Sequence, residues 1–167
     1  MKTKDIVIIG MMSSIIITLQ VVLRFLPNVE LVSLFILLFT VIFGRKTLYI
    51  IYIFVLVEGF LYGFGFWWFT YLYIWTVLYL IACIFKKQPS AFYFAMISGG
   101  FGLCFGALTA IPYFITGGIS TGIAYWVQGI PFDVVHGPSN FIITLLLFKP
   151  LYLILDKINK QIEHKSE

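Results

Sequence analysis

The chain has 167 residues, of which 61% are hydrophobic, 19% aromatic and only 11% charged. An average soluble chain is about a quarter charged and roughly half apolar, so this composition excludes a cytosolic globular enzyme, a disordered segment and a nucleic-acid binder. The net charge of +4 points the same way, because the basic residues form short clusters between apolar blocks rather than one continuous stripe. The composition therefore predicts an integral membrane protein.

Six apolar blocks follow one another along the chain, and most approach the roughly 20 residues that a helix needs to cross a bilayer. The first follows a basic leader, but no small-x-small cleavage site comes after it, so we expect an uncleaved span. The second block is short, and residues 122–130 either extend the sixth block or form a separate interfacial helix. The predicted spans are approximately 6–26, 31–43, 47–64, 67–85, 91–115 and 131–148.

The placement of lysine and arginine predicts the topology. Ten of the eleven basic residues lie before the first span, between spans two and three, between spans four and five, or after span six. The other connections are short and turn-prone, and they hold only Arg24. By the positive-inside rule, both termini are cytoplasmic. With no long linker, repeat or low-complexity stretch, residues 1–167 are expected to form a single all-α transmembrane domain with six helices.

Small residues recur every four positions along the first and fifth predicted spans. Such stripes let helix backbones approach closely inside lipid. In the fifth span we expect the stripe to serve internal packing. In the first span it starts near the cytoplasmic end, where a partner membrane protein could dock. The residues are Gly10, Ser14 and Thr18 in the first span, and Ser98, Gly102, Gly106 and Ala110 in the fifth.

Glu58 is an ionisable residue inside the third predicted span. A charged group near the bilayer centre costs roughly 2.5 to 3.5 kcal/mol on insertion scales, so each such residue is a functional hypothesis. Glu58 lies about eleven residues beyond Thr47, or roughly 17 Å along the helix, which puts it in the outer half of the membrane. The alternative is a structural hydrogen bond to a neighbouring helix.

The fourth predicted span carries an aromatic face. Trp68, Tyr71, Trp75 and Tyr79 recur at offsets of three, four and four residues, which places them on one side of a helix. Core packing or an interfacial aromatic belt would also explain them, particularly for Trp68 near the span end. Trp75 lies deeper.

The sixth predicted span has a polar face made of Asp133, His136, Asn140 and Thr144. Together with Glu58 and the aromatic face, the first three predict a pocket that opens to the outside, because small-molecule sites combine apolar walls with a few placed polar groups. Two alternatives remain open. The aspartate could be a helix N-terminal charge, or it could simply pair with the histidine one turn away.

Motifs for nucleotides, catalysis and metals are absent from the sequence. Residues 44–47 superficially resemble a phosphate loop, but the spacing is not that of G-x-x-x-x-G-K-[ST]. Cys83 and Cys104 lie inside apolar blocks without metal-site spacing. We therefore expect no enzymatic activity, no cofactor and no metal.

Taken together, six short spans, cytoplasmic ends and the stripe in span one resemble the S components of energy-coupling factor (ECF) transporters. The resemblance covers nearly the whole chain as a pattern, and its most similar runs are 27–31, 43–46, 58–65 and 124–133. S components are substrate-specific membrane subunits that bind vitamins or metal ions. They join a transmembrane T component driven by two ABC-type ATPases, and they are thought to rotate in the membrane to release the ligand inside.

This resemblance implies a multi-pass protein of the bacterial plasma membrane that captures a small molecule from outside. Gly10 and Ser14 match the first-helix docking motif of the family, commonly Ala-x-x-x-Ala. Aromatic walls and carboxylates suit a pyridine or pyrimidine vitamin with a protonatable nitrogen, whereas a metal ion would require more ligands. The expected binding residues are Glu58, Tyr62, Trp68, Tyr71, Trp75, Trp126, Asp133, His136 and Asn140.

Two other functions remain open on the sequence. A membrane scaffold of the rod-shape MreD type has a similar size and span number, but it would need no polar pocket. A small intramembrane enzyme could use Asp133 and His136, but no nucleophile lies at a convincing offset from them.

Overall fold

The computed structural model describes residues 3–87 and 89–164, and these residues are arranged as helices without any strand. The expected all-α class is therefore confirmed for the described part of the chain. The helices are α1 (Thr3–Leu23), α2 (Val32–Phe43), α3 (Lys46–Tyr62), α4 (Phe66–Phe85), α5 (Ala91–Leu103) and α6 (Phe105–His164).

Glycines end α2 and α3. Gly44 and Gly63 follow these helices with φ values of 56° and 85°, a left-handed conformation that glycine adopts without steric cost. Both stops agree with the breaks expected from the sequence to within two residues.

The last third of the chain differs from the sequence prediction. The expected span 91–115 is interrupted at Cys104, where α5 ends and α6 begins. Within α6 the backbone leaves helical geometry at Gly118, with φ 77° and ψ −178°, and this residue divides the helix into legs 105–117 and 119–164. Residues 122–130 therefore extend the last helix. That helix also continues beyond Phe148, where the predicted span ends. The lysines that follow end the apolar run of the sequence, but they do not end the helix.

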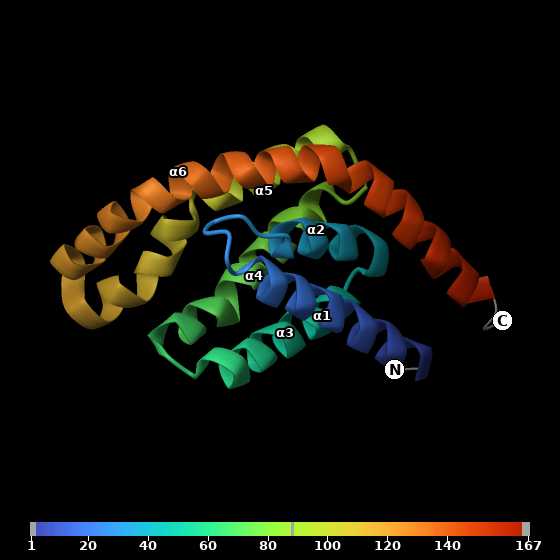
Figure 1. The fold of residues 1–167 in the computed structure, drawn as a ribbon, viewed down its shortest axis with the longest axis horizontal. Helices are drawn as coiled ribbons and strands as arrows, with labels where there is room; N and C mark the ends of the chain where they lie inside the picture. Colours follow the sequence, from blue (N-terminus) through green and yellow to red (C-terminus); the bar gives the residue numbers. More distant parts are fainter. Residues whose placement is uncertain (1–2, 88, 165–167) are drawn as a thin grey trace.

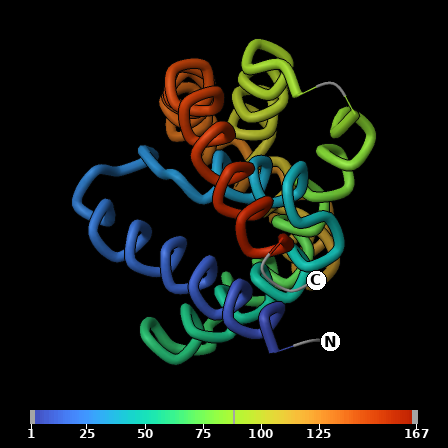
Figure 2. Tube along the Cα trace, turned by 90° about the vertical axis from the view of Figure 1, so that its right-hand side faces the viewer, coloured from blue at the N-terminus to red at the C-terminus, as the bar shows by residue number. Residues whose placement is uncertain are grey.

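The two legs of α6 fold back on each other as a hairpin, and the second leg runs beside α5 (Figures 1 and 2). Tyr113 stacks on Tyr125 across the hairpin, with ring centroids 3.8 Å apart. A Cβ atom at Gly102 would come within 2.9 Å of the Cα of Gly137 on the second leg. The small residues of the fifth predicted span therefore serve close internal packing, as expected.

The helix ends fall into two groups (Figure 1). The start of α1, the α2–α3 turn, the α4–α5 connection and the end of α6 lie at one end of the molecule, which we call the basic end. An ion pair of 2.7 Å between Lys46 and Asp5 joins α3 to α1 there. The α1–α2 loop, the α3–α4 turn and the Gly118 reversal lie at the opposite end, which we call the loop end. The sequence grouped the connections in the same way.

Helix α2 is the centre of the fold. It contacts the five other helices, and residues 32–40 are all buried. A helix that is apolar on every side is stable only when it is enclosed, and its 12 residues span roughly 18 Å. The almost uninterrupted apolar sequence of this block therefore agrees with its burial on all sides.

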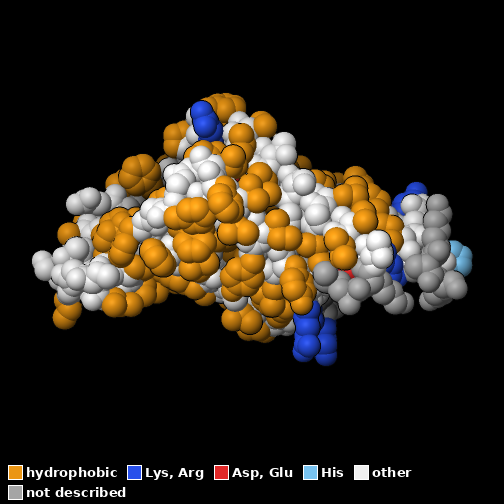
Figure 3. Space-filling model, turned by 90° about the horizontal axis from the view of Figure 1, so that it is seen from below, with side chains coloured by type: hydrophobic (Ala, Val, Ile, Leu, Met, Phe, Trp, Pro, Cys, Tyr) orange, Lys and Arg blue, Asp and Glu red, His pale blue; other side chains and the backbone are white. Residues whose placement is uncertain are grey.

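Many large hydrophobic side chains are exposed, and lysine and arginine are confined to small areas of the face shown in Figure 3. Three helical stretches are long and apolar enough to cross a membrane, namely Thr3–Leu23, Phe66–Phe85 and the stretch Ala91–His164, and α2 is a shorter apolar helix. This surface is compatible with an integral membrane protein.

Candidate ligand-binding site

Two adjoining cavities at the loop end form what we call the cleft. The first, of about 360 Å³, lies between α4 and both legs of α6. The second, of about 270 Å³, lies between the end of α1, the α1–α2 loop and α4. Asn28, Tyr71, Phe105 and His136 line both cavities, so the two lie side by side.

Aromatic rings form part of the cleft wall. Trp67 and Tyr71 of α4 face the first cavity together with Phe105, Tyr125 and Phe132 of α6. In the second cavity, Tyr71 meets Trp75 edge-on, with a centroid distance of 5.4 Å. Edge-to-face and offset-stacked contacts of this kind favour a planar aromatic guest.

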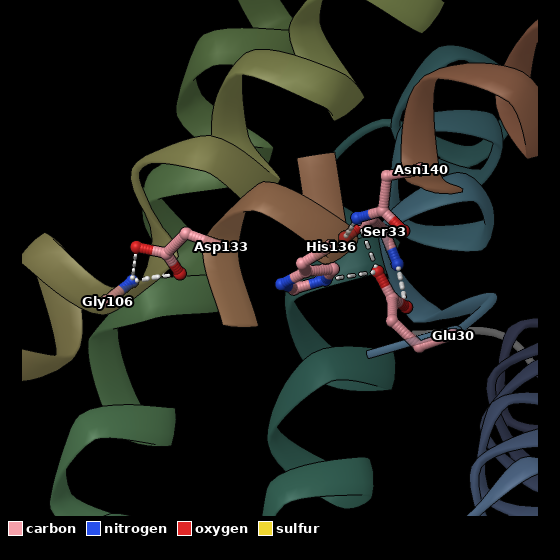
Figure 4. Close-up of polar contacts among 6 residues, drawn as sticks. All are labelled: Glu30, Ser33, Gly106, Asp133, His136 and Asn140. Carbon is pink, nitrogen blue, oxygen red and sulfur yellow. Dashed lines mark hydrogen bonds and ion pairs between the residues drawn. The ribbon is translucent and has the colours of Figure 1, made fainter. Parts of the chain in front are cut away.

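Asp133 caps the first leg of α6. Its two carboxylate oxygens accept the backbone N–H of Gly106 at 2.9 and 3.1 Å (Figure 4). The N–H groups of a first helical turn have no partner within their own helix, and a negative charge there is stabilising. A Cβ at position 106 would lie only 2.5 Å from one of these oxygens, so the contact requires glycine. The idea that Asp133 marks the start of its own helix is wrong, because α6 runs through Pro131.

Glu30 connects the α1–α2 loop to α6 through a polar network (Figure 4). Its Oε1 accepts a hydrogen bond of 2.8 Å from Asn140 and contacts His136 Nε2 at 3.4 Å. Its Oε2 accepts the backbone N–H of Ser33 at 2.8 Å, in the first turn of α2. The ion-pair contact of His136 within the described residues therefore goes to Glu30 and not to Asp133.

The network keeps Glu30 ionised. Burial by itself would raise the pKa of this carboxyl group. The hydrogen bond and electrostatic contact with His136, together with hydrogen bonds from Ser33, outweigh burial and hold the pKa of Glu30 below its usual value. Glu30 was not predicted as a site residue, because it lies outside the apolar spans, where an ionisable side chain is not unusual. The available signal was its position three residues before Ser33, where an acidic side chain can cap a helix.

Four of the predicted binding residues, Tyr71, Trp75, Asp133 and His136, line the cleft. Asn140 is buried behind it, where it holds Glu30. The polar face of the sixth predicted span does point inward, and all four of its members are buried.

The other predicted binding residues lie elsewhere. Glu58 is buried, and its Oε1 has no hydrogen-bond partner in the described structure. Trp68 donates its indole N–H to the carbonyl of Val55 at 2.9 Å, which ties α4 to α3. Tyr62 and Trp126 are exposed. None of these four residues lines either cavity.

The small-residue stripe of α1 faces outward. Gly10 and Ser14 are exposed, and a Cβ atom at Gly10 would meet no atom within 4 Å. The Ser14 hydroxyl donates to the carbonyl of Gly10 at 2.9 Å, which leaves little polar surface on this face. The stripe is therefore free to contact lipid or another helix.

The described residues thus form an all-helical protein with apolar helices and an aromatic cleft at one end. No family model matches the sequence, and comparisons with curated proteins and with solved structures gave no match either.

Proposed function

We propose that this chain is the substrate-binding subunit, or S component, of an ECF-type uptake transporter in a bacterial plasma membrane. In this proposal, six segments cross the bilayer, both termini are cytoplasmic and the cleft captures a small vitamin-like molecule from outside. The observation that carries the proposal is the position of the cleft, which lies at the opposite end of the molecule from the basic clusters.

Charge distribution supports this orientation. Because Lys46 lies at the basic end, where the termini and the other lysine-bearing connections gather, the positive-inside rule favours a cytoplasmic position for that end. The cleft then opens to the exterior, where an uptake subunit meets its substrate. The second leg of α6 would extend roughly 69 Å, so its lysine-bearing last part reaches beyond the bilayer core.

The chemistry of the cleft supports a small organic ligand. Binding pockets for such ligands are usually about 300 to 1,000 Å³ in volume, with mainly apolar walls and a few polar groups. The two adjoining cavities, of about 360 and 270 Å³, fall in this range when taken together. Among the described residues, no group of three or more His, Cys, Asp or Glu side chains could hold a metal ion, which favours an organic molecule over a metal ion as cargo.

Two features of the chain suggest its protein partners: the absence of a phosphate-binding loop from the sequence and the exposed small-residue face of α1. The chain has no phosphate-binding loop, so the energy for uptake would come from two ABC-type ATPases acting through a T component. The exposed Gly10 and Ser14 face of α1 is the proposed docking surface for the T component, because small side chains let helices approach closely.

Co-purification tests the proposal directly. The full-length tagged chain is expressed in its native host, and its partners are identified after mild detergent extraction. Recovery of a T component with two ATPases is the expected result. Recovery of cell-wall synthesis proteins instead would identify a scaffold, and substrate turnover by the purified chain alone would identify an enzyme.

A further inference from the structure

The two carboxylates of the cleft are already engaged by donors from the protein. Glu30 is contacted by Asn140, Ser33 and His136, and Asp133 accepts the N–H of Gly106 with both oxygens. A cationic ligand would have to compete with these donors. Displacing a donor from a buried carboxylate leaves that donor unpaired, which is costly in a low-dielectric site.

Arg24 is an exposed basic residue of the cleft that forms no ion pair with the described residues. It lines the second cavity beside Gln20 and Asn28, whose side-chain amides can also donate hydrogen bonds. In the described part of the chain, the ion pairs are Lys46–Asp5, His136–Glu30 and Lys160–Asp156, so Arg24 has no carboxylate partner. It is also the one basic residue that the sequence places among the loop-end connections.

On the assumption that the proposed function is correct, we propose that the ligand is an aromatic carboxylic acid bound as its anion. Its ring occupies the first cavity, between the side chains of α4 and α6. Its carboxylate enters the second cavity and pairs with Arg24. The guanidinium group presents a planar fork of donors that matches a carboxylate. This assignment differs from the aromatic heterocycle with a protonatable nitrogen expected from the sequence, because in the structure the cleft carboxylates are engaged and Arg24 forms no ion pair with the described residues.

The two cavities lie next to each other, as such a ligand requires. Tyr71, Phe105 and His136 line both of them, so a ring in the first cavity can extend a short chain into the second without leaving the cleft. Trp75, whose indole N–H has no acceptor among the described residues, also belongs to the wall of the second cavity. The Glu30–His136 pair is locally compensated and therefore does not oppose an anion as an isolated carboxylate would.

A matched set of probes tests the charge preference. 3-Phenylpropanoate, 3-phenylpropanamide and 3-phenylpropylamine share the ring and chain length and differ in the charge of the terminal group. Each is titrated at neutral pH into the purified full-length chain in detergent, and binding is followed by tryptophan fluorescence. A charge-assisted hydrogen-bonded pair predicts that the acid binds about tenfold more tightly than the amide. The amine should bind most weakly.

Variants then assign the preference to one residue. Arg24→Gln should reduce the acid-to-amide preference to less than about twofold, because the glutamine amide can donate a hydrogen bond but carries no charge. Arg24→Lys should retain part of the preference, which keeps the test valid if the glutamine variant does not fold. The matched control is Arg45→Gln at the basic end, which should behave as the wild type.

The proposal is overturned if the amine or the amide binds as tightly as the acid, if the acid fails to bind at millimolar concentration, or if Arg24→Gln retains the full preference. The proposed function is tested separately by co-purification. If the subunit assembles with its transporter but binds the amine most tightly, the ligand is not a carboxylic acid. The proposed transport function would be unaffected by that result.

Discussion

Glu30 and Glu58 are both carboxylates with little exposed side chain, but their surroundings differ. Glu30 lies in a loop, and donors from α2 and α6 contact both of its oxygens. Glu58 lies within α3, and its Oε1 has no partner in the described structure. The residue that the sequence singled out is therefore the isolated one, and the residue that it overlooked organises the cleft. Burial of a charged side chain inside a span shows that the residue costs free energy there. A carboxylate on which several hydrogen-bond donors converge is better evidence of a functional site.

The largest effect is expected from removing Glu30. In Glu30→Ala, His136, Asn140 and the N–H of Ser33 lose their common acceptor, and the loop loses its connection to α6. Breaking one partner of a buried charged pair typically costs 3 to 5 kcal/mol, so we expect the free energy of unfolding to fall by about 3 kcal/mol. Denaturant unfolding in detergent micelles measures this. A loss below about 1 kcal/mol would show that the network is not structural.

Lowering the pH should also destabilise the folded protein, but by less than Glu30→Ala does. Because the pKa of Glu30 is lower in the folded protein than in the unfolded chain, its stabilising effect is fully present above the unfolded value of about 4.3. It is lost as the pH falls through the folded pKa. The thermal midpoint of the wild type should therefore decrease more steeply below that value than the midpoint of Glu30→Gln. Parallel pH curves for the two proteins would contradict this assignment.

The comparison also explains which parts of the structure could be predicted. Helix breaks at Gly44 and Gly63, and the inward face of Asp133, His136 and Asn140, follow from local punctuation and helical periodicity, which a single sequence contains. The hydrogen bond of Asp133 to Gly106 joins residues 27 positions apart, and the contact of Glu30 with His136 joins residues 106 positions apart. Such pairings depend on tertiary packing, so periodicity alone cannot reveal them.

The α6 hairpin shows the same limit. The connection after the fifth predicted span was expected to be short and turn-prone, and the structure has a reversal at Gly118. The break at Cys104 was missed because residues 91–115 form one continuous apolar run. Apolar composition specifies the environment of a segment, but the exact point at which a helix is interrupted depends on what packs against it.

Glu58 should respond much less than Glu30 to conservative replacement. Glu58→Gln keeps the shape and removes the charge, and the unpartnered Oε1 loses no hydrogen bond. We expect a change in the free energy of unfolding within about 0.5 kcal/mol and no change in the affinity for 3-phenylpropanoate. The same replacement at position 30 weakens a charge-assisted network and should lower stability by about 1 to 2 kcal/mol. Equal effects in unfolding measurements would remove the distinction between the two carboxylates.

The smallest effect on the isolated subunit is expected on the outer face of α1, far from both carboxylates. Gly10→Leu adds a side chain at a position where a Cβ would meet nothing within 4 Å, so fold and probe binding should be unchanged. If this face docks a T component, the larger side chain pushes the partner helix away, and assembly and uptake should fall. Tyr49→Leu is the matched control, because Tyr49 is an exposed apolar position on α3, outside the stripe. Co-purification and probe titration are measured on both variants. Normal assembly of Gly10→Leu would falsify the docking surface, and loss of both assembly and binding would show that the stripe supports the fold of the subunit itself.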